Sequence, residues 1–117
     1  MDPIKARPKK GPEAIIQAAI VKKLTMMGYL VMETHGNLFQ MGFPDLYITH
    51  FDTGGKWVEV KNPLAYDFTP AQRKYFPQLN AHGTPIWILT SDSDEEIKKL
   101  SRPQNWMYYL KGMYDVR

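Results

Sequence analysis

The sequence predicts a single α/β domain, in which helices flank a central mixed β-sheet and the elements follow the order α-β-β-β-α-β. Three observations support this prediction. Apolar residues recur at helical spacing near the N-terminus, two alternating segments then flank a turn signal, and a helix-start signal farther on precedes a short, continuous apolar run. A hairpin is antiparallel, whereas a helix between two strands implies a crossover and a parallel pair, so the sheet should be mixed.

The length and composition fit one domain and exclude several kinds of site. The chain has 117 residues, of which 44% are hydrophobic, which is enough for one core. It contains no cysteine, so disulfides, zinc-thiolate sites and cysteine nucleophiles are excluded. No apolar run approaches the ~20 residues of a membrane helix, and the N-terminus lacks the apolar core of a secretory signal. We therefore expect a cytoplasmic protein that does not enter a membrane.

The first helix is expected to open at Gly11-Pro12-Glu13, because proline suits the first helical turn and an acid suits the helix dipole. At ~100° per residue, Glu13 falls in the middle of the apolar stripe and Gln17 lies beside it. A carboxylate on an apolar face is costly unless it has a partner or lies at the rim of the core. Glu13 could therefore meet a partner or could simply favour the dipole at a frayed end. The predicted buried stripe consists of Ile16, Ile20, Leu24 and Met27.

Three strands are expected next. Residues 29–34 form the first, and residues 45–50 and 56–61 form a hairpin around the turn Asp52-Thr53-Gly54-Gly55.

A second helix follows the hairpin. Thr69 and Gln72 make a capping box with proline in the first turn, and the helix should end near residues 82–83 with Phe76 and Leu79 facing inward. Residues 85–89 then form a buried strand and residues 91–100 a short helix. Beyond Pro103 the sequence leaves a helix, an edge strand and an interface all open.

Side-chain parity in the hairpin predicts a cluster of charged groups. Residues two apart on a strand share a face, so packing the apolar set together also brings Asp45, Glu59 and Lys61 together. Two such carboxylates could share a divalent ion. The alternative is a solvated hairpin face, but Trp57 and Tyr47 have the same parity as the acids and argue against open water. The apolar set consists of Leu46, Ile48, Val58 and Val60.

These residues resemble a known family of nucleases. Pro44-Asp45 followed by Glu59-Val60-Lys61 is similar to the PD-(D/E)XK signature, here in its E-x-K form. The helix that carries Glu13 and Gln17, the Gly42-x-Pro44-Asp45 step and the Thr69-Pro70-Ala71-Gln72 segment are similar to its VRR-NUC branch, which includes stand-alone phage and bacterial nucleases. The resemblance runs from about Glu13 to Leu100. The linker 62–68 departs from the pattern because it carries two aromatic residues and an acid.

The resemblance implies a restriction-endonuclease-like core and a site for Mg²⁺ or Mn²⁺. The implied ligands are Asp45, Glu59, the Val60 carbonyl and Glu13, while Lys61 would orient the attacking water and stabilise charge on the phosphate. Gln72 corresponds to a catalytic glutamine of the family, although its capping role explains it equally well.

The N-terminal residues 1–12 form a predicted basic, flexible leader, and residues 13–117 form the predicted nuclease domain. The net charge of +3 favours a polyanionic partner. We expect the leader, together with Gln17, to contact nucleic acid. The basic residues of the leader are Lys5, Arg7, Lys9 and Lys10.

The expected function is that of a metal-dependent deoxyribonuclease. Through the resemblance, the expected substrate is branched or four-way-junction DNA in replication, recombination or repair, cut by a homodimer. Two alternatives remain at this point: a module of the same fold that binds nucleic acid without cutting it, and a subunit whose role is assembly.

Overall fold

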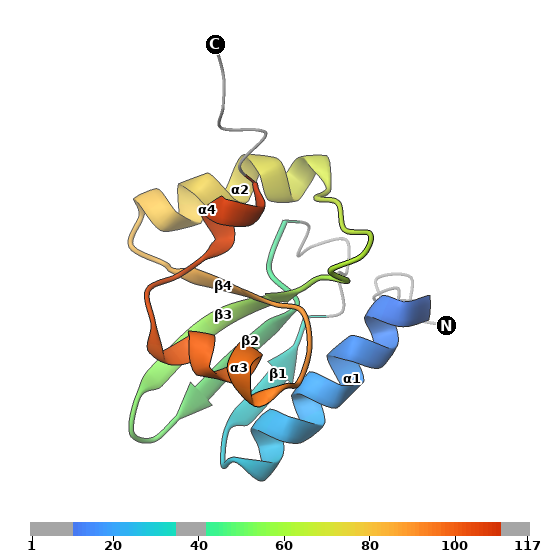
Figure 1. Cartoon of the computed structure of the whole chain (residues 1–117). Coiled ribbons are helices and arrows are strands. Elements are labelled where there is room, and N and C mark those ends of the chain that lie inside the picture. Colours follow the sequence, from blue (N-terminus) through green and yellow to red (C-terminus); the bar gives the residue numbers. More distant parts are fainter. Residues whose placement is uncertain (1–10, 35–41, 111–117) are drawn as a thin grey trace, which may run out of the picture.

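The computed structural model describes residues 11–34 and 42–110 (Figure 1). Its elements follow the predicted order α-β-β-β-α-β, and shorter helices come after the last strand. The helices of these two ranges are too short or too polar for a membrane span. The elements are α1 (Gly11–Met26), β1 (Leu30–Glu33), β2 (Leu46–His50), β3 (Gly54–Val60), α2 (Pro70–Ala81), β4 (Ile86–Leu89), α3 (Asp94–Lys98), the 3₁₀ helix η2 (Lys99–Ser101) and α4 (Trp106–Tyr109).

The described strands form one sheet in the order β1-β2-β3-β4. The pairs β1–β2 and β2–β3 are antiparallel, and β3 and β4 are parallel, so the predicted mixed sheet is confirmed. The hairpin turns where Gly54 adopts a φ of +74°, a conformation that favours glycine. Its register places Leu46 opposite Val58 and Tyr47 opposite Trp57, which fixes the face of every side chain in the pair.

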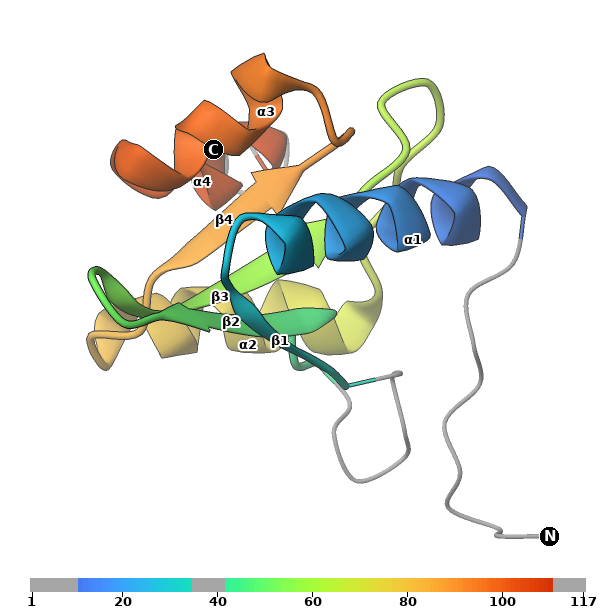
Figure 2. The same cartoon turned by 90° about the horizontal axis from the view of Figure 1, so that it is seen from below.

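The two faces of the sheet carry separate cores, and Figure 2 shows α1 and α3 on one face and α2 on the other. On one face, α1 and α3 pack against the apolar hairpin set, with Ile20, Leu24 and Ile97 among the buried residues. On the other face, α2 and α4 pack through Phe76 and Trp106 against the opposite parity of β3 and β4. Each apolar face of the sheet therefore has a helical cover.

The first helix begins where Gly11-Pro12-Glu13 predicted it, and it ends before the last residue of the predicted buried stripe. It begins at Gly11, inside the predicted leader, and residues 1–10 lie outside the described residues. Ile20 and Leu24 are fully buried, but Met27 is 45% exposed, so its place in the buried stripe was wrong. The helix ends at Met26, and Gly28 turns the chain with a φ of +94°, so helical periodicity no longer applies to Met27.

Of the alternatives left open beyond Pro103, Trp106–Tyr109 form a short helix, α4, while residues 111–117 lie outside the described residues. Just before α4, amide side chains hydrogen-bond to the outer edge of β4. The Ile88 N–H donates to Asn105 Oδ1 (2.6 Å), Asn105 Nδ2 donates to the Ile88 carbonyl (3.0 Å), and the Ile86 N–H donates to Gln104 Oε1 (2.9 Å). These side chains satisfy backbone groups that a sheet edge would otherwise leave unpaired.

We predict that Asn105→Ala lowers the free energy of unfolding by about 1–3 kcal/mol, because it leaves the buried Ile88 N–H and C=O without these bonds. Urea unfolding followed by circular dichroism measures the change. Asp92→Ala, at an exposed position, is the control and should stay within about 0.5 kcal/mol of wild type. Equal stability of both variants would contradict a structural role for Asn105.

Candidate active site

The hairpin brings two acids together where β2 begins and β3 ends. The Asp45 N–H donates to Glu59 Oε1 (3.0 Å), and the Val60 N–H donates to Asp45 Oδ2 (2.7 Å). Each acid therefore bonds to the backbone of the other strand. The convergence predicted from parity is confirmed, and Glu59 is only 1% exposed.

The chain that enters β2 is held tightly before it reaches Asp45. Thr34 donates to this segment three times, from its N–H to the Asp45 carbonyl (2.9 Å) and from Oγ1 to the carbonyls of Pro44 (2.9 Å) and Asp45 (3.2 Å). Gly42 has a φ of +85°, and a Cβ there would lie 2.6 Å from Tyr75 and 3.0 Å from the Ala71 carbonyl of α2. Only glycine fits this approach, so α2 and β1 together fix the backbone that presents Asp45.

Lys61 follows β3 and is buried beside Glu59. Its Nζ lies 3.0 Å from Glu59 Oε2 and donates to the Asp67 carbonyl (2.7 Å), while the residue as a whole is 4% exposed. The ammonium also lies 4.5 Å from the centre of the Phe68 ring, within the range of a cation–π interaction. The loop 62–68 therefore folds back over the lysine that precedes it.

Gln72 connects this charged pair to the start of α2. Its Nε2 donates to Glu59 Oε2 (2.8 Å), and its Oε1 accepts from Lys61 Nζ (3.3 Å) and from the Thr69 N–H (3.1 Å). The reciprocal bond from the Gln72 N–H to Thr69 Oγ1 (3.1 Å) completes the predicted capping box. One side chain makes both sets of contacts, so capping and a place in the charged cluster are compatible.

Glu13 and Gln17 lie on α1, which packs on the face of the sheet opposite the two acids. The start of α1 lies at the same end of the sheet as the loop that leaves β3 (Figure 2). Glu13 is half-buried there, whereas Gln17 is 8% exposed and donates from Nε2 to Glu33 Oε1 (3.0 Å). The roles of Glu13 in metal binding and of Gln17 in nucleic-acid contact stay predictions. The predicted contacts of Lys5, Arg7, Lys9 and Lys10 fall outside the described residues.

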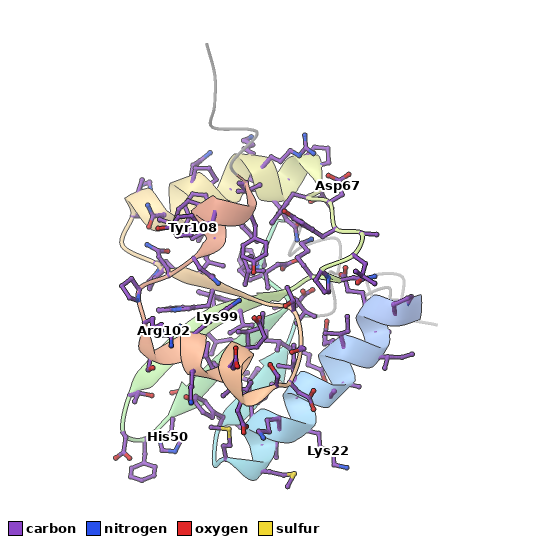
Figure 3. The ribbon with its side chains drawn as sticks, viewed as in Figure 1. Lys22, His50, Asp67, Lys99, Arg102 and Tyr108 are labelled. Atoms are coloured by element: carbon purple, nitrogen blue, oxygen red, sulfur yellow. The ribbon has the colours of Figure 1, made fainter. Side chains whose placement is uncertain are left out.

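Asp67 and Arg73 also shape the site, although no sequence pattern predicted their pairing. Asp67, in the loop before α2 (Figure 3), accepts from the Phe68 N–H (2.8 Å) and from Arg73 Nη2 (2.8 Å). These two bonds hold the pKa of the Asp67 carboxyl below its usual value. The only signal for them was the unexpected acid in the linker, because no periodic pattern relates Asp67 to Arg73.

The chemistry of this donor set fits a hard divalent cation. Two carboxylates stand against one ammonium, which leaves one net negative charge in the cluster of Asp45, Glu59 and Lys61. Carboxylate oxygens and a backbone carbonyl suit Mg²⁺, which commonly takes one or two carboxylates and fills its remaining positions with water and phosphate. Among residues 11–34 and 42–110, no three Asp, Glu or His side chains are grouped to hold a metal, so Glu13 is not gathered with the other two acids.

A mixed four-stranded sheet with helices on both faces, and a carboxylate–lysine cluster at its hairpin, defines a restriction-endonuclease-like α/β fold. Comparison with solved structures agrees. The chain is similar to a structure described as a "VRR_NUC domain", with a TM-score of 0.59, 20% sequence identity, and coverage of 77% of this chain and 95% of that chain. At this identity the likeness shows a shared fold. No protein-family model and no curated protein matches the sequence.

We predict that Thr69→Ala lowers the free energy of unfolding by about 0.5–2 kcal/mol through loss of the helix cap. Gln72→Ala should lower it further, by about 1–3 kcal/mol beyond the loss of the cap, because Glu59 then lacks a buried donor. Urea unfolding without added metal compares the two. Gln78→Ala, an exposed amide on the same helix, is the control. A smaller loss for Gln72→Ala than for Thr69→Ala would reduce Gln72 to its capping role.

Proposed function

We propose that this chain is a nuclease that uses Mg²⁺ or Mn²⁺ to hydrolyse phosphodiester bonds in DNA. The observation that carries the proposal is the cluster of half-buried Asp45 with buried Glu59, Lys61 and Gln72, where β2 begins, β3 ends and α2 begins. Such a cluster is poor at stabilising a fold, because desolvating the charges costs about as much as their attraction returns. Its chemistry suits phosphoryl transfer, and the likeness to a VRR_NUC domain supports the same conclusion.

Each residue has a distinct role in this proposal. Asp45, Glu59 and the Val60 carbonyl would hold the metal ion, and Glu13, which is not grouped with the two acids among the described residues, would join them directly or through a water. The ion would supply Lewis acidity and lower the pKa of bound water. The bonds from the backbone to Asp45 and Glu59 aim the two carboxylates before substrate arrives. This preorganisation spares the site from reordering during the reaction.

Lys61 stabilises the charge that develops on the phosphate. A lysine ammonium has three N–H donors, and three acceptors lie around this one: Glu59 Oε2, the Asp67 carbonyl and Gln72 Oε1. The Gln72 contact is the longest, at 3.3 Å. It is therefore the bond that Lys61 exchanges most readily for a phosphate oxygen or an attacking water.

The proposed substrate is branched DNA, including four-way junctions, and the proposed active form is a homodimer with one site for each of two strands. A chain of this size offers limited surface for reading base edges, so selection should come from backbone and shape. The pI of 9.1 supports a polyanionic partner, and the basic leader would add phosphate contacts. Replication, recombination and repair are the processes in which such substrates arise.

We predict that Asp45→Asn abolishes Mg²⁺-dependent cleavage while the protein stays folded. The amide oxygen can still accept from the Val60 N–H, but the charge needed by the metal is gone. Cleavage of duplex, single-stranded, flap and four-way DNA, each with and without Mg²⁺, measures the effect, and circular dichroism checks the fold. Asp52→Asn, on the exposed hairpin turn, is the matched control. Wild-type turnover by Asp45→Asn would refute the assignment, and binding without cleavage by wild type would identify a non-cutting module.

Glu13→Gln separates the two roles left open for the first acid. If Glu13 holds the ion, cleavage should fall steeply and recover only partly at high Mg²⁺, while the metal-free protein loses no stability. If it only favours the helix dipole, the substitution costs about 0.3–1 kcal/mol and leaves catalysis intact. Melting without metal and the Mg²⁺ dependence of cleavage are measured together. A destabilised variant with normal Mg²⁺ dependence would remove Glu13 from the site.

A further inference from the structure

A pocket of about 400 Å³ lies between η2, α4 and the loop that leaves β3. Its lining combines aromatic rings with positive charge, and the proposed catalysis uses none of these side chains. Figure 3 shows Lys99, Arg102 and Tyr108 on the same side of the molecule, on η2, just after it and on α4. The residues that define this pocket, named here the tyrosine pocket, are Tyr66, Tyr108, Tyr109, Lys99 and Arg102.

Arg102 provides one cation of the pocket. Hydrogen bonds hold its backbone, while its guanidinium is available to a ligand. Its carbonyl accepts from Trp87 Nε1 (2.9 Å), and its N–H donates to the Lys99 carbonyl (3.0 Å). Within residues 11–34 and 42–110, its guanidinium makes no hydrogen bond or ion pair. A planar guanidinium of this kind matches two oxygens of a phosphate.

Lys99 is the second cation, and it is positioned by Glu96 and Tyr109. It forms an ion pair with Glu96 and donates to the Tyr109 hydroxyl (3.4 Å). Burial lowers the pKa of Lys99, but the bond to Glu96 and its charge outweigh burial and leave the pKa raised. Two cations and one carboxylate therefore give this region one net positive charge, the opposite sign to the cluster around Asp45.

The tyrosines offer ring faces to a ligand. Tyr108 is 75% exposed and Tyr66 is 41% exposed, so both rings are open to solvent. The Tyr66 and Tyr109 rings meet edge to face, with centres 5.6 Å apart, so each helps fix the other. Every nucleobase has a π-face, so stacking on such rings does not depend on base identity.

A short series of contacts connects the tyrosine pocket with the catalytic cluster. The Tyr66 and Phe68 rings lie 6.0 Å apart, and Lys61 Nζ lies 4.5 Å from the Phe68 ring. The residue between these two rings is Asp67, whose carbonyl accepts from Lys61. A strand whose phosphate lies at Lys61 can therefore place a neighbouring nucleotide at Tyr66. A base inside a duplex has both faces covered by its neighbours, so it must leave the duplex stack before it can stack there.

We propose that the tyrosine pocket holds one unpaired nucleobase of a DNA strand, stacked on Tyr108, with the adjoining phosphate bound by Arg102. The proposal rests on the nuclease function above and narrows its substrate to branched DNA with an unpaired nucleotide beside the cut, such as a flap, in preference to a fully paired four-way junction. The aromatic linker residue Tyr66 and the aromatic helix α4 then act together as a specificity element.

Binding without metal tests the pocket separately from catalysis. The full-length chain is titrated, with a chelator present, against fluorescent oligo-dT and against a fully paired duplex, and anisotropy is measured. Tyr108→Ala should weaken oligo-dT binding roughly 5- to 150-fold and leave duplex binding unchanged. Tyr108→Phe should restore binding, because the ring is retained. Arg102→Ala should reduce the salt dependence for oligo-dT by about 0.7 in slope, as expected for one phosphate contact to a single strand.

Two control variants remove the same kinds of group, a ring and a cation, from outside the pocket. Phe51→Ala removes a ring that is 90% exposed on the hairpin turn, and Lys98→Ala removes an exposed cation outside the pocket. Both should bind as wild type. Wild-type affinity for oligo-dT in both Tyr108→Ala and Arg102→Ala would contradict the proposal that this pocket binds a nucleobase, even if the chain cleaves DNA normally. Conversely, ring-dependent oligo-dT binding by a chain that never cleaves would uphold the pocket and refute the nuclease function.

Discussion

The ion pair between Glu59 and Lys61 constrains the rest of the structure more than any other contact. Both side chains are almost fully buried, so each charge needs partners that replace water. Those partners come from different elements: the Asp45 N–H from the entry to β2, Gln72 from α2, and the Asp67 carbonyl from the loop. The entry to the hairpin, the start of α2 and the path of residues 62–68 must therefore adopt their positions together.

The apolar hairpin set and the residues of the charged cluster lie on different faces of the sheet. The apolar hairpin set packs under α1 and α3, where Ile48 and Val58 are fully buried. The acids lie on the opposite face, at the end of the strands, where α2 supplies polar contacts through Gln72. Most of the hydrophobic stabilisation thus comes from residues that do not touch the charged cluster. A negatively charged site can persist because the core under α1 and α3 packs on the other face of the sheet, away from the charged side chains.

The sequence predicted features that follow from local rules. Parity in the hairpin placed Asp45 beside Glu59, and the capping box placed Thr69 and Gln72 at the start of α2. It did not predict which helix covers which face, because both sheet faces are apolar and the parity rule treats them alike. For the same reason it did not predict that α1 packs opposite the acids. The Asp67–Arg73 pair and the Asn105 bonds to β4 join residues through side-chain geometry, which no periodic pattern records.

The hydrogen bonds between side-chain amides and the backbone of β4 have a further consequence for how the protein behaves at high concentration. An uncovered strand at the edge of a sheet is a template on which another chain can add a strand, and this is a common route to aggregation. Asn105 and Gln104 occupy the backbone groups of Ile88 and Ile86 that such a strand would use. All residues of β4 are buried and apolar, so without these bonds the strand would favour the addition of a strand from another chain. The residues between η2 and α4 thus block intermolecular β-pairing at this edge of the sheet. Any assembly of this chain must therefore use other surfaces.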